Sequence, residues 1–172
     1  NGITVYIGAA GAQAWGFSNA VYDLGKNFDI KFTVEHKTSA KVDYTAGADY
    51  TKAMYTSVQM GALEMRIRPL KNENGVKSFA YDLYMNGVNI GSSYIDSGDT
   101  APADTLTYSI RFINGYINVT RSDNVEIMTV MPADYNTVRM VSDYAFNDAR
   151  VGFGTFELGG YVRLTKLNVA KF

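Results

Sequence analysis

The sequence predicts an all-β fold, an antiparallel β-sandwich of two sheets that forms a single domain over residues 1–172. Residues 106–130 read as three short strands joined by two turns, which is the pattern of a β-meander. The composition favours strands and turns, with 13 Tyr and 16 Gly but only 3 Pro. Alternating apolar runs recur along the chain at the spacing expected of a sandwich or barrel, giving about ten to twelve strands.

The meander provides the clearest strand signals in the chain. In its first run, apolar side chains occupy every second position from Leu106 to Phe112, so one face of the strand is expected to be buried. The pair Asn114-Gly115 tolerates positive φ angles, which a tight type I′ hairpin turn requires. A second turn is expected at Ser122–Asn124, because short polar side chains there can hydrogen-bond to the nearby backbone.

Alternation of apolar and polar residues marks further strands outside the meander. The predicted runs are Ile3–Ile7, Phe28–Glu35, Leu63–Arg68, Phe79–Met85, Val88–Ile95, Arg150–Glu157 and Tyr161–Phe172. Asn86-Gly87 is expected to turn the chain between two of them. Pro69 cannot donate to a ladder, so it is expected to end the strand before it. A change of phase between Leu164 and Leu167 indicates a β-bulge in the last strand.

Two segments of the N-terminal half lack a clean period. Residues 12–25 contain Trp15, the only Trp of the chain, and are expected to form a loop with a short edge strand at 20–24. Residues 38–61 are too long for an ordinary connection, so they are either a functional loop or hide an element. Within them, residues 53–60 fit a helical turn or a strand.

Composition excludes several classes of function. The chain has no Cys, which rules out disulfides, thiolate chemistry and cysteine-ligated zinc. A net charge of −1, from 16 basic and 17 acidic residues, gives no field that would attract nucleic acid. No apolar run approaches the roughly 20 residues that span a bilayer, so membrane insertion is not expected. The start at Asn1 without a charged and apolar leader is interpreted as that of a processed or excised module.

Three stretches carry a family resemblance. They read FDIKFTV from Phe28, LTYSIRFINGYINV from Leu106 and RVGFGTFELGGYVRLTKLNV from Arg150. Their order and spacing over residues 28–172 resemble those of the concanavalin A-like lectin/glucanase superfamily, with its laminin-G-like jelly rolls. The resemblance implies a lectin-like jelly roll of carbohydrate-binding-module type, with a closing strand that pairs near the first one. This fold hosts lectins, binding modules, glycosidases, lyases and adhesin modules, so the site must decide the function.

The resemblance does not extend to the catalytic pattern of the family's glycosidases. Those enzymes resemble one another in a strand that carries two Glu with an Asp between them, so that both carboxylates face one cleft. No such strand occurs here, and Glu35 and Glu64 lie on two different predicted strands. A lyase would need the single His36 beside Arg66 and Tyr84, a combination that has little specificity. The protein is therefore predicted not to be an enzyme.

Sugar binding is the favoured function. Sugars present an apolar C–H face and a rim of hydroxyls, so their sites combine exposed aromatic rings with fixed polar side chains. One predicted site is a loop site around Trp15 and the Tyr-bearing stretch 44–55. The other is a groove on the charged face of the middle strands, with Ser109 and Arg111 on the same phase of neighbouring runs. The candidate ligand-binding residues are Trp15, Tyr44, Tyr50, Tyr55, Arg66, Arg68, Asp82 and Tyr84.

Each of these candidates also has a purely structural interpretation. Trp15 can be part of the core, and the loop Tyr rings can pack without touching a ligand. The charged face can simply be solvated. No cofactor is expected, with calcium as the alternative, because residues 96–104 contain three Asp and Asp148 lies near the Gly-rich strand. Turn formation explains Asp residues in such a loop equally well.

Taken together, the sequence predicts a non-catalytic module that binds an oligosaccharide or polysaccharide, without nucleic acid or membrane partners. It is expected to be a monomeric module of a larger protein that is secreted or exposed at the cell surface. The alternatives are a structural or adhesion domain with a protein partner, and a glycoside hydrolase or polysaccharide lyase of the same fold.

Overall fold

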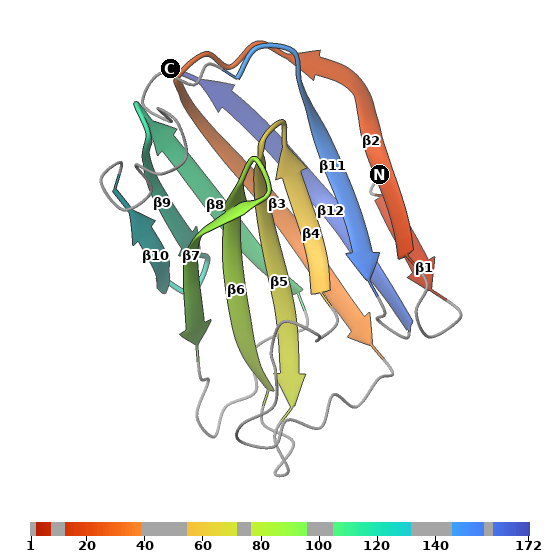
Figure 1. The fold of residues 1–172 in the computed structure, drawn as a ribbon. Coiled ribbons are helices and arrows are strands. Elements are labelled where there is room, and N and C mark those ends of the chain that lie inside the picture. Colours follow the sequence, from red (N-terminus) through yellow and green to blue (C-terminus); the bar gives the residue numbers. More distant parts are fainter. Residues whose placement is uncertain are drawn as a thin grey trace.

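In the computed structural model, the described residues are 3–7, 13–38, 55–71, 77–95, 105–131, 146–156 and 160–172. They form two antiparallel six-stranded sheets that are stacked face to face (Figure 1). The predicted all-β fold with two antiparallel sheets is therefore confirmed. This described part contains no helix that is long and apolar enough to cross a membrane.

Each sheet contains six of the twelve described strands. Sheet A contains, in spatial order, β1 (Ile3–Ile7), β12 (Gly160–Lys171), β3 (Asn27–Thr38), β8 (Thr105–Ile113), β9 (Tyr116–Arg121) and β10 (Glu126–Val130). Sheet B contains β2 (Gln13–Tyr22), β11 (Ala149–Phe156), β4 (Tyr55–Met60), β5 (Leu63–Lys71), β6 (Lys77–Met85) and β7 (Val88–Ile95). The predicted meander is β8–β9–β10, and the closing strand β12 pairs with β1 as the resemblance implies.

The predicted turns and bulge are confirmed. Asn114 and Gly115, between β8 and β9, have φ angles of 46° and 86°, as a type I′ turn requires. Asn86 and Gly87, between β6 and β7, have φ angles of 50° and 78°. In β12, the register with β3 shifts between Leu164 and Lys166, where the change of phase indicated a bulge.

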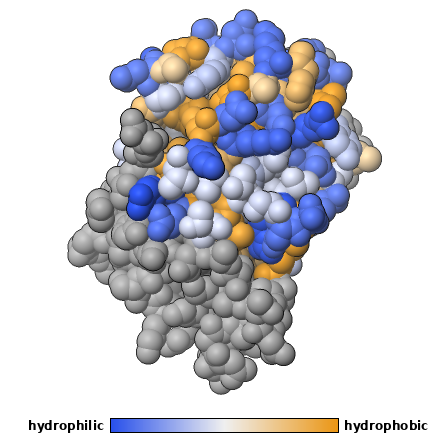
Figure 2. Space-filling view, turned by 180° about the vertical axis from the view of Figure 1, so that it is seen from behind, coloured by the Kyte–Doolittle hydropathy of each residue, from blue (hydrophilic) through white to orange (hydrophobic). Residues whose placement is uncertain are grey.

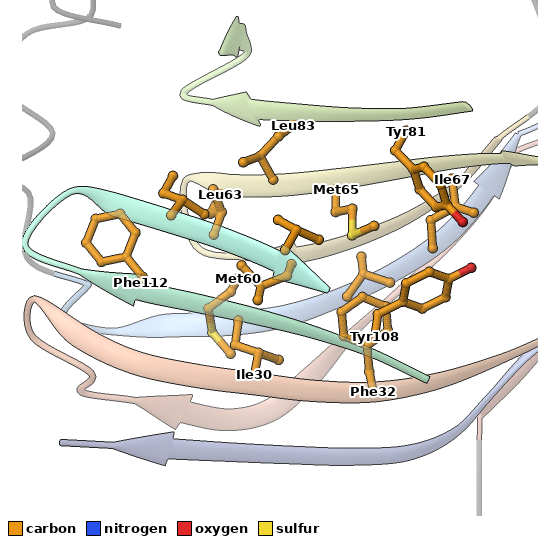
Figure 3. Packing of buried hydrophobic residues seen from close by; sticks show 14 of the residues in the cluster. Ile30, Phe32, Met60, Leu63, Met65, Ile67, Tyr81, Leu83, Tyr108 and Phe112 are labelled. Carbon is orange, nitrogen blue, oxygen red and sulfur yellow. The ribbon is translucent and has the colours of Figure 1, made fainter. Parts of the chain in front are cut away.

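Apolar and polar side chains alternate along the strands, so one face of each sheet is buried in a shared core. On β5, Leu63, Met65 and Ile67 are fully buried, whereas Glu64 and Arg66 between them point to the opposite face. Figure 3 shows side chains from both sheets meeting in this interior. Burying each of these apolar side chains stabilises the fold by about 1.5–3 kcal/mol, so the register of each strand is strongly specified.

An aromatic cluster fixes the chain just before β11. The Phe28 and Phe112 rings stack with centroids 5.2 Å apart, and the Phe146 ring meets them edge-on at 4.8 and 4.9 Å. The backbone N–H of Phe146 donates to the Gly25 carbonyl, and the Leu24 N–H donates to the Phe146 carbonyl, each at 2.8 Å. These contacts anchor the start of β11 beside the end of β2.

Two strand predictions were wrong. Residues 13–22 form the complete edge strand β2 rather than a loop with a short strand at 20–24. The register of β2 with β11 shifts between Arg150 and Gly152, and this irregularity hides the period in the sequence. Strand β5 continues past Pro69 to Lys71, because its described partner there is β6 alone and proline is tolerated in a strand with one partner.

One charged side chain crosses the interior between the sheets. Arg121 of sheet A is 6% exposed, and its Nη1 donates to the Tyr81 hydroxyl of sheet B at 3.1 Å. Its Nη2 lies 2.6 Å from Asp123 Oδ2, in the turn that follows β9. This hydrogen bond from Arg121 lowers the pKa of the Asp123 carboxyl, and the pKa of Arg121 is raised in return.

The outer face of sheet A carries a mixed surface. Figure 2, which views the molecule from behind Figure 1, shows hydrophilic side chains interspersed with smaller hydrophobic patches over the described part. The exposed Phe172 ring lies under the Arg111 guanidinium, at 5.3 Å from the ring centroid. A hollow of about 240 Å³ on this sheet is lined by Lys31 and by residues of β8, β9 and the following turn.

The Arg121–Asp123 pair makes a pH-dependent contribution to stability. Because the pKa of Asp123 is lower in the folded chain than its unfolded value of about 3.9, the stabilisation is present above that value and is lost as the pH falls through the folded pKa. Asp123→Asn is expected to reduce the free energy of unfolding at pH 7 by about 1 kcal/mol, a modest amount because solvent screens the pair. Urea unfolding of the parent and the variant, at pH 7 and below pH 3, measures this difference in the free energy of unfolding. An equal deficit at both pH values would contradict the assignment.

Candidate functional site

Strand registers align the outward-facing side chains of sheet B in rows across the strands. One row, from β2 to β7, contains Trp15, Gly154, Ser57, Arg66, Asp82 and Ser92. The adjacent row contains Phe17, Gly152, Gln59, Glu64, Tyr84 and Asn89. Residues between these positions, such as Val58, Met65 and Leu83, are buried in the core. Both rows therefore lie on the outer face of sheet B.

A hollow of about 480 Å³ opens on this face over β5, β6 and β7. Ala80 lies between Arg68 and Tyr94 in the strand registers, and its small side chain leaves space between those two larger ones. Tyr94 is 51% exposed, so its ring is accessible. The residues that line the hollow are Arg68, Ala80, Tyr81, Asp82, Tyr84, Asn89, Ser92, Ser93 and Tyr94.

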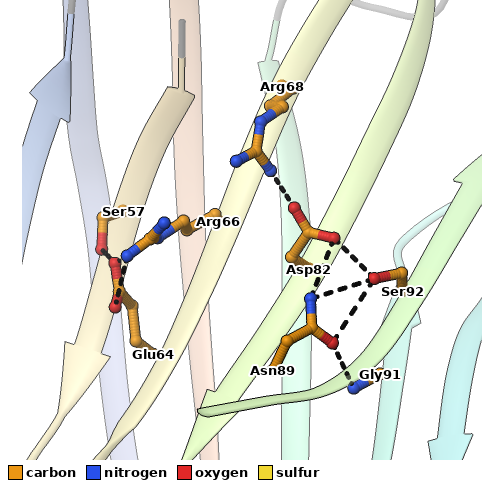
Figure 4. Close-up of polar contacts among 8 residues, drawn as sticks. All are labelled: Ser57, Glu64, Arg66, Arg68, Asp82, Asn89, Gly91 and Ser92. Carbon is orange, nitrogen blue, oxygen red and sulfur yellow. Dashed lines mark hydrogen bonds and ion pairs between the residues drawn. The ribbon is translucent and has the colours of Figure 1, made fainter. Parts of the chain in front are cut away.

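Asp82 is the centre of a polar network in the hollow (Figure 4). Arg68 Nη1 donates to Asp82 Oδ2, and the Ser92 hydroxyl donates to Asp82 Oδ1 at 2.7 Å. The Asn89 amide donates to the Ser92 hydroxyl at 3.1 Å and to Asp82 Oδ1 at 3.4 Å. Asn89 Oδ1 accepts the Gly91 backbone N–H at 3.0 Å. The network holds one carboxylate, one hydroxyl and one amide in fixed positions.

Arg68 is held more deeply than the other residues of the network. Its side chain is 2% exposed, and its guanidinium lies 5.2 Å from the centroid of the Tyr55 ring. The Arg68 Nε is buried and has no hydrogen-bond partner among the described residues.

Arg66 fixes two tyrosine rings on the same face. Its guanidinium lies 4.6 Å from the centroid of the Tyr55 ring and 4.1 Å from that of the Tyr84 ring. Arg66 Nε donates to Glu64 Oε1 at 2.8 Å, and the Ser57 hydroxyl donates to the same oxygen at 2.8 Å. Burial opposes the charge of Arg66, but the hydrogen bond and Coulomb attraction of Glu64 raise its pKa overall. The two rings are thereby preorganised.

The structure brings most of the predicted site residues onto one face. Arg66, Arg68, Asp82 and Tyr84 share the outer face of sheet B, as the strand phase predicted. Tyr55 lies on this face as well, at the start of β4 rather than in a loop.

Three other site predictions have different outcomes. Trp15 was placed in a loop, but it belongs to β2 and points outward, with 37% of its surface exposed. Ser109 and Arg111 lie on β8 of sheet A, so they do not share the face of the predicted groove. Tyr44 and Tyr50 lie outside the described residues.

Sequence reasoning missed Asn89, Ser92 and Phe17. The register of β6 with β7 shifts between Leu83 and Tyr84, so the period of β7 does not reveal which residues face outward. The Asn86-Gly87 turn contains the useful signal, because a tight hairpin there pairs Tyr84 with Asn89. Phe17 was missed together with β2, for which the sequence has no regular alternation.

Metal binding receives no support from the described residues. They contain no group of three or more His, Asp and Glu side chains that could hold a metal ion. The predicted calcium loop, residues 96–104, lies outside the described part of the chain, so calcium remains a prediction.

The comparisons with known proteins concern the fold. No protein-family model matches the sequence, and a search of curated proteins gives no match. CG-16, a homodimeric agglutinin from chicken liver, is 10% identical, with 92% of this chain and 100% of that chain covered and a TM-score of 0.50. Xenopus laevis galectin-Ib is 9% identical, with 92% and 100% covered and a TM-score of 0.48.

A toad ovary galectin in complex with thio-digalactose is 8% identical, with 94% of this chain and 99% of that chain covered and a TM-score of 0.47. At such identities a likeness shows the fold alone. The fold is that of a lectin-type jelly-roll β-sandwich, in agreement with the family resemblance of the sequence.

The Arg68–Asp82 pair is expected to be important for stability. Asp82→Ala leaves the buried Arg68 guanidinium without its carboxylate, which is expected to lower the free energy of unfolding by about 3 kcal/mol. Urea denaturation checks this. Asp23→Ala is the control. Its carboxylate lies 3.5 Å from Lys171 Nζ in an exposed ion pair, whose loss is expected to change the free energy of unfolding very little. Equal effects of the two substitutions would contradict the prediction.

Proposed function

We propose that this protein is a non-catalytic carbohydrate-binding module that binds a glycan on the outer face of sheet B. The observation that carries the proposal is the position of the Tyr55 and Tyr84 rings. The Arg66 guanidinium lies 4.6 Å from the centroid of the Tyr55 ring and 4.1 Å from that of the Tyr84 ring. The rings lie beside a hollow whose polar groups are fixed by Asp82. An apolar ring face next to ordered hydrogen-bonding groups matches the two surfaces of a sugar.

Each part of the hollow has a defined role in this proposal. The exposed Tyr94 ring and the half-buried Tyr84 ring line the hollow and offer apolar surface to the C–H face of a sugar. Asp82, Asn89 and Ser92 offer acceptors and donors to its hydroxyls, because each of these side chains retains hydrogen-bonding capacity beyond the contacts described. Since these groups are ordered before a ligand arrives, little conformational entropy is lost on binding.

The arrangement of carboxylates favours binding over hydrolysis. On the described outer face of sheet B, Glu64 is held by Arg66 and Asp82 is held by Arg68. Each carboxylate is therefore already engaged by a guanidinium, whereas glycoside hydrolysis needs a pair of carboxyl groups that flank the scissile bond. These two residues are therefore assigned to positioning aromatic rings and sugar hydroxyls.

The proposal includes the setting predicted from the sequence. A polysaccharide or oligosaccharide would be the ligand, and the protein would act as a secreted or cell-surface module. The lectin-type fold shared with the chicken-liver agglutinin is compatible with this, but a fold does not assign a function, so the side chains support the proposal. The second candidate is an adhesion domain with a protein partner, since the Phe17 and Tyr94 rings are more than half exposed.

Glycan binding is tested by retardation of the protein in gels that contain soluble polysaccharides. Tyr84→Ala removes a ring that lines the hollow and is expected to weaken the binding about tenfold. The matched control is Tyr116→Ala, which removes a 37% exposed ring that lies in sheet A. Equal retardation of both variants and the parent would contradict the site. The absence of any glycan ligand on a broad array would favour the protein-partner function.

A further inference from the structure

We infer that the glycan site continues across sheet B to an aromatic platform formed by Trp15 and Phe17 on β2, so that the ligand is an extended glycan chain rather than a terminal sugar. The inference rests on the proposed function and specifies its substrate class. It uses two rings that the hollow over β5–β7 does not contain.

Register places the platform in line with the polar site. Trp15 belongs to the same row as Arg66 and Asp82, and Phe17 belongs to the same row as Glu64 and Tyr84. The order of strands between them is β2, β11, β4, β5 and β6. Four strand spacings separate β2 from β6, a distance of about 19 Å. A ligand that touches both ends must be several sugar rings long.

Strand β11 lies between β2 and β4, and it has no side chains of its own in these rows. Its outward positions there are Gly152 and Gly154. A Cβ atom added to Gly152 would lie 2.8 Å from Cε1 of Phe17 and 3.2 Å from Cβ of Gln59. The Phe17 ring therefore lies against the backbone of Gly152, in space that any other residue would occupy. The Phe17 ring thus covers β11 at Gly152, and both Gly152 and Gly154 are buried.

The platform is accessible from solvent. Trp15 is 37% exposed and Phe17 is 57% exposed, although large aromatic residues are usually buried. One edge of the Phe17 ring is held at Gly152, so the ring is ordered while much of its surface remains open. An ordered, exposed ring is the feature that stacks on the apolar face of a sugar at low entropic cost.

The neighbouring polar groups favour a glycan as the occupant. Along the two rows, the rings of β2 are followed by Gln59 on β4 and by the Ser57–Glu64–Arg66 hydrogen-bonded group. Aromatic and hydrogen-bonding surfaces thus alternate across the face. A glycan chain repeats an apolar ring face and a rim of hydroxyls from one sugar to the next, so its chemistry matches this alternation.

The single Trp provides a direct probe of the platform. The experiment uses a ladder of oligosaccharides, from disaccharide to hexasaccharide, prepared from a polysaccharide that retards the protein. Affinity is measured by calorimetry and the emission of Trp15 by fluorescence. Affinity is expected to rise with chain length, and the emission is expected to change with the long oligosaccharides but not with the disaccharide.

Substitutions separate the platform from the hollow. Trp15→Ala and Phe17→Ala are each expected to weaken hexasaccharide binding by about three- to tenfold and to leave disaccharide binding unchanged. Gly152→Ala keeps both rings but displaces the Phe17 ring, and it is expected to have the same selective effect. Val21→Ala is the matched control, because this side chain is 46% exposed on the same strand but lies beyond the register shift.

The outcomes distinguish the inference from the proposed function. Equal affinities for all lengths, with unchanged Trp15 emission and a binding loss in Tyr84→Ala, would overturn the inference and leave the proposed function in place. No binding at any length would overturn both. Binding that depends on Trp15 but not on Tyr84 would overturn the continuous site. A second copy of the chain covering the platform would appear as a Trp15-dependent dimer in sedimentation and would also overturn the inference.

Discussion

The period-two geometry of the β-strand is the constraint on which the structure depends. Each strand of sheet B must bury one set of side chains and expose the other, and antiparallel pairing places the exposed sets side by side. Burial of Leu63, Met65 and Ile67 on β5 therefore fixes where Glu64 and Arg66 point. The composition of the outer surface is a direct consequence of the core, because a slip of one residue would exchange the buried and the exposed side chains.

Arginine has a different role on each side of sheet B. Inside the sandwich, Arg121 links the two sheets through Tyr81 and is neutralised by Asp123. On the outer face, Arg66 holds aromatic rings and Arg68 holds the Asp82 carboxylate. A planar guanidinium can stack on a ring and donate to a carboxylate at the same time, which lysine does poorly. These side chains of the outer face are thus held in place by the protein itself, and such order would lower the entropic cost of binding the proposed glycan.

The sequence was sufficient to predict the parts of the site that obey simple alternation. The shared face of Arg66, Asp82 and Tyr84 follows from two uninterrupted strands and needed no structure. Ser92 was missed because the register of β6 with β7 shifts between Leu83 and Tyr84, which separates it from the Asn86-Gly87 turn. Register shifts are set by pairing with distant strands, so a single chain segment does not reveal them.

Strand β2 was also difficult to predict from its own sequence. Its aromatic residues looked like loop residues, because Gly16 occupies an inward position where an apolar side chain would mark the period. The register shift opposite Arg150 and Gly152 breaks the pattern further. Only pairing with β11 shows that Trp15 and Phe17 face the same side as the charged residues of β5, so two predicted sites on separate elements become one surface.

Glycine in β11 affects both the stability of sheet B and the proposed glycan site. A glycine inside a strand weakens it, because the residue loses more conformational freedom and packs no side chain. An aromatic ring that covers the glycine from the neighbouring strand compensates for part of this loss, and Phe17 occupies that position over Gly152. The same contact leaves the outer face of the ring open. The Phe17 ring can therefore stabilise the strand and still present a surface on which a sugar could stack.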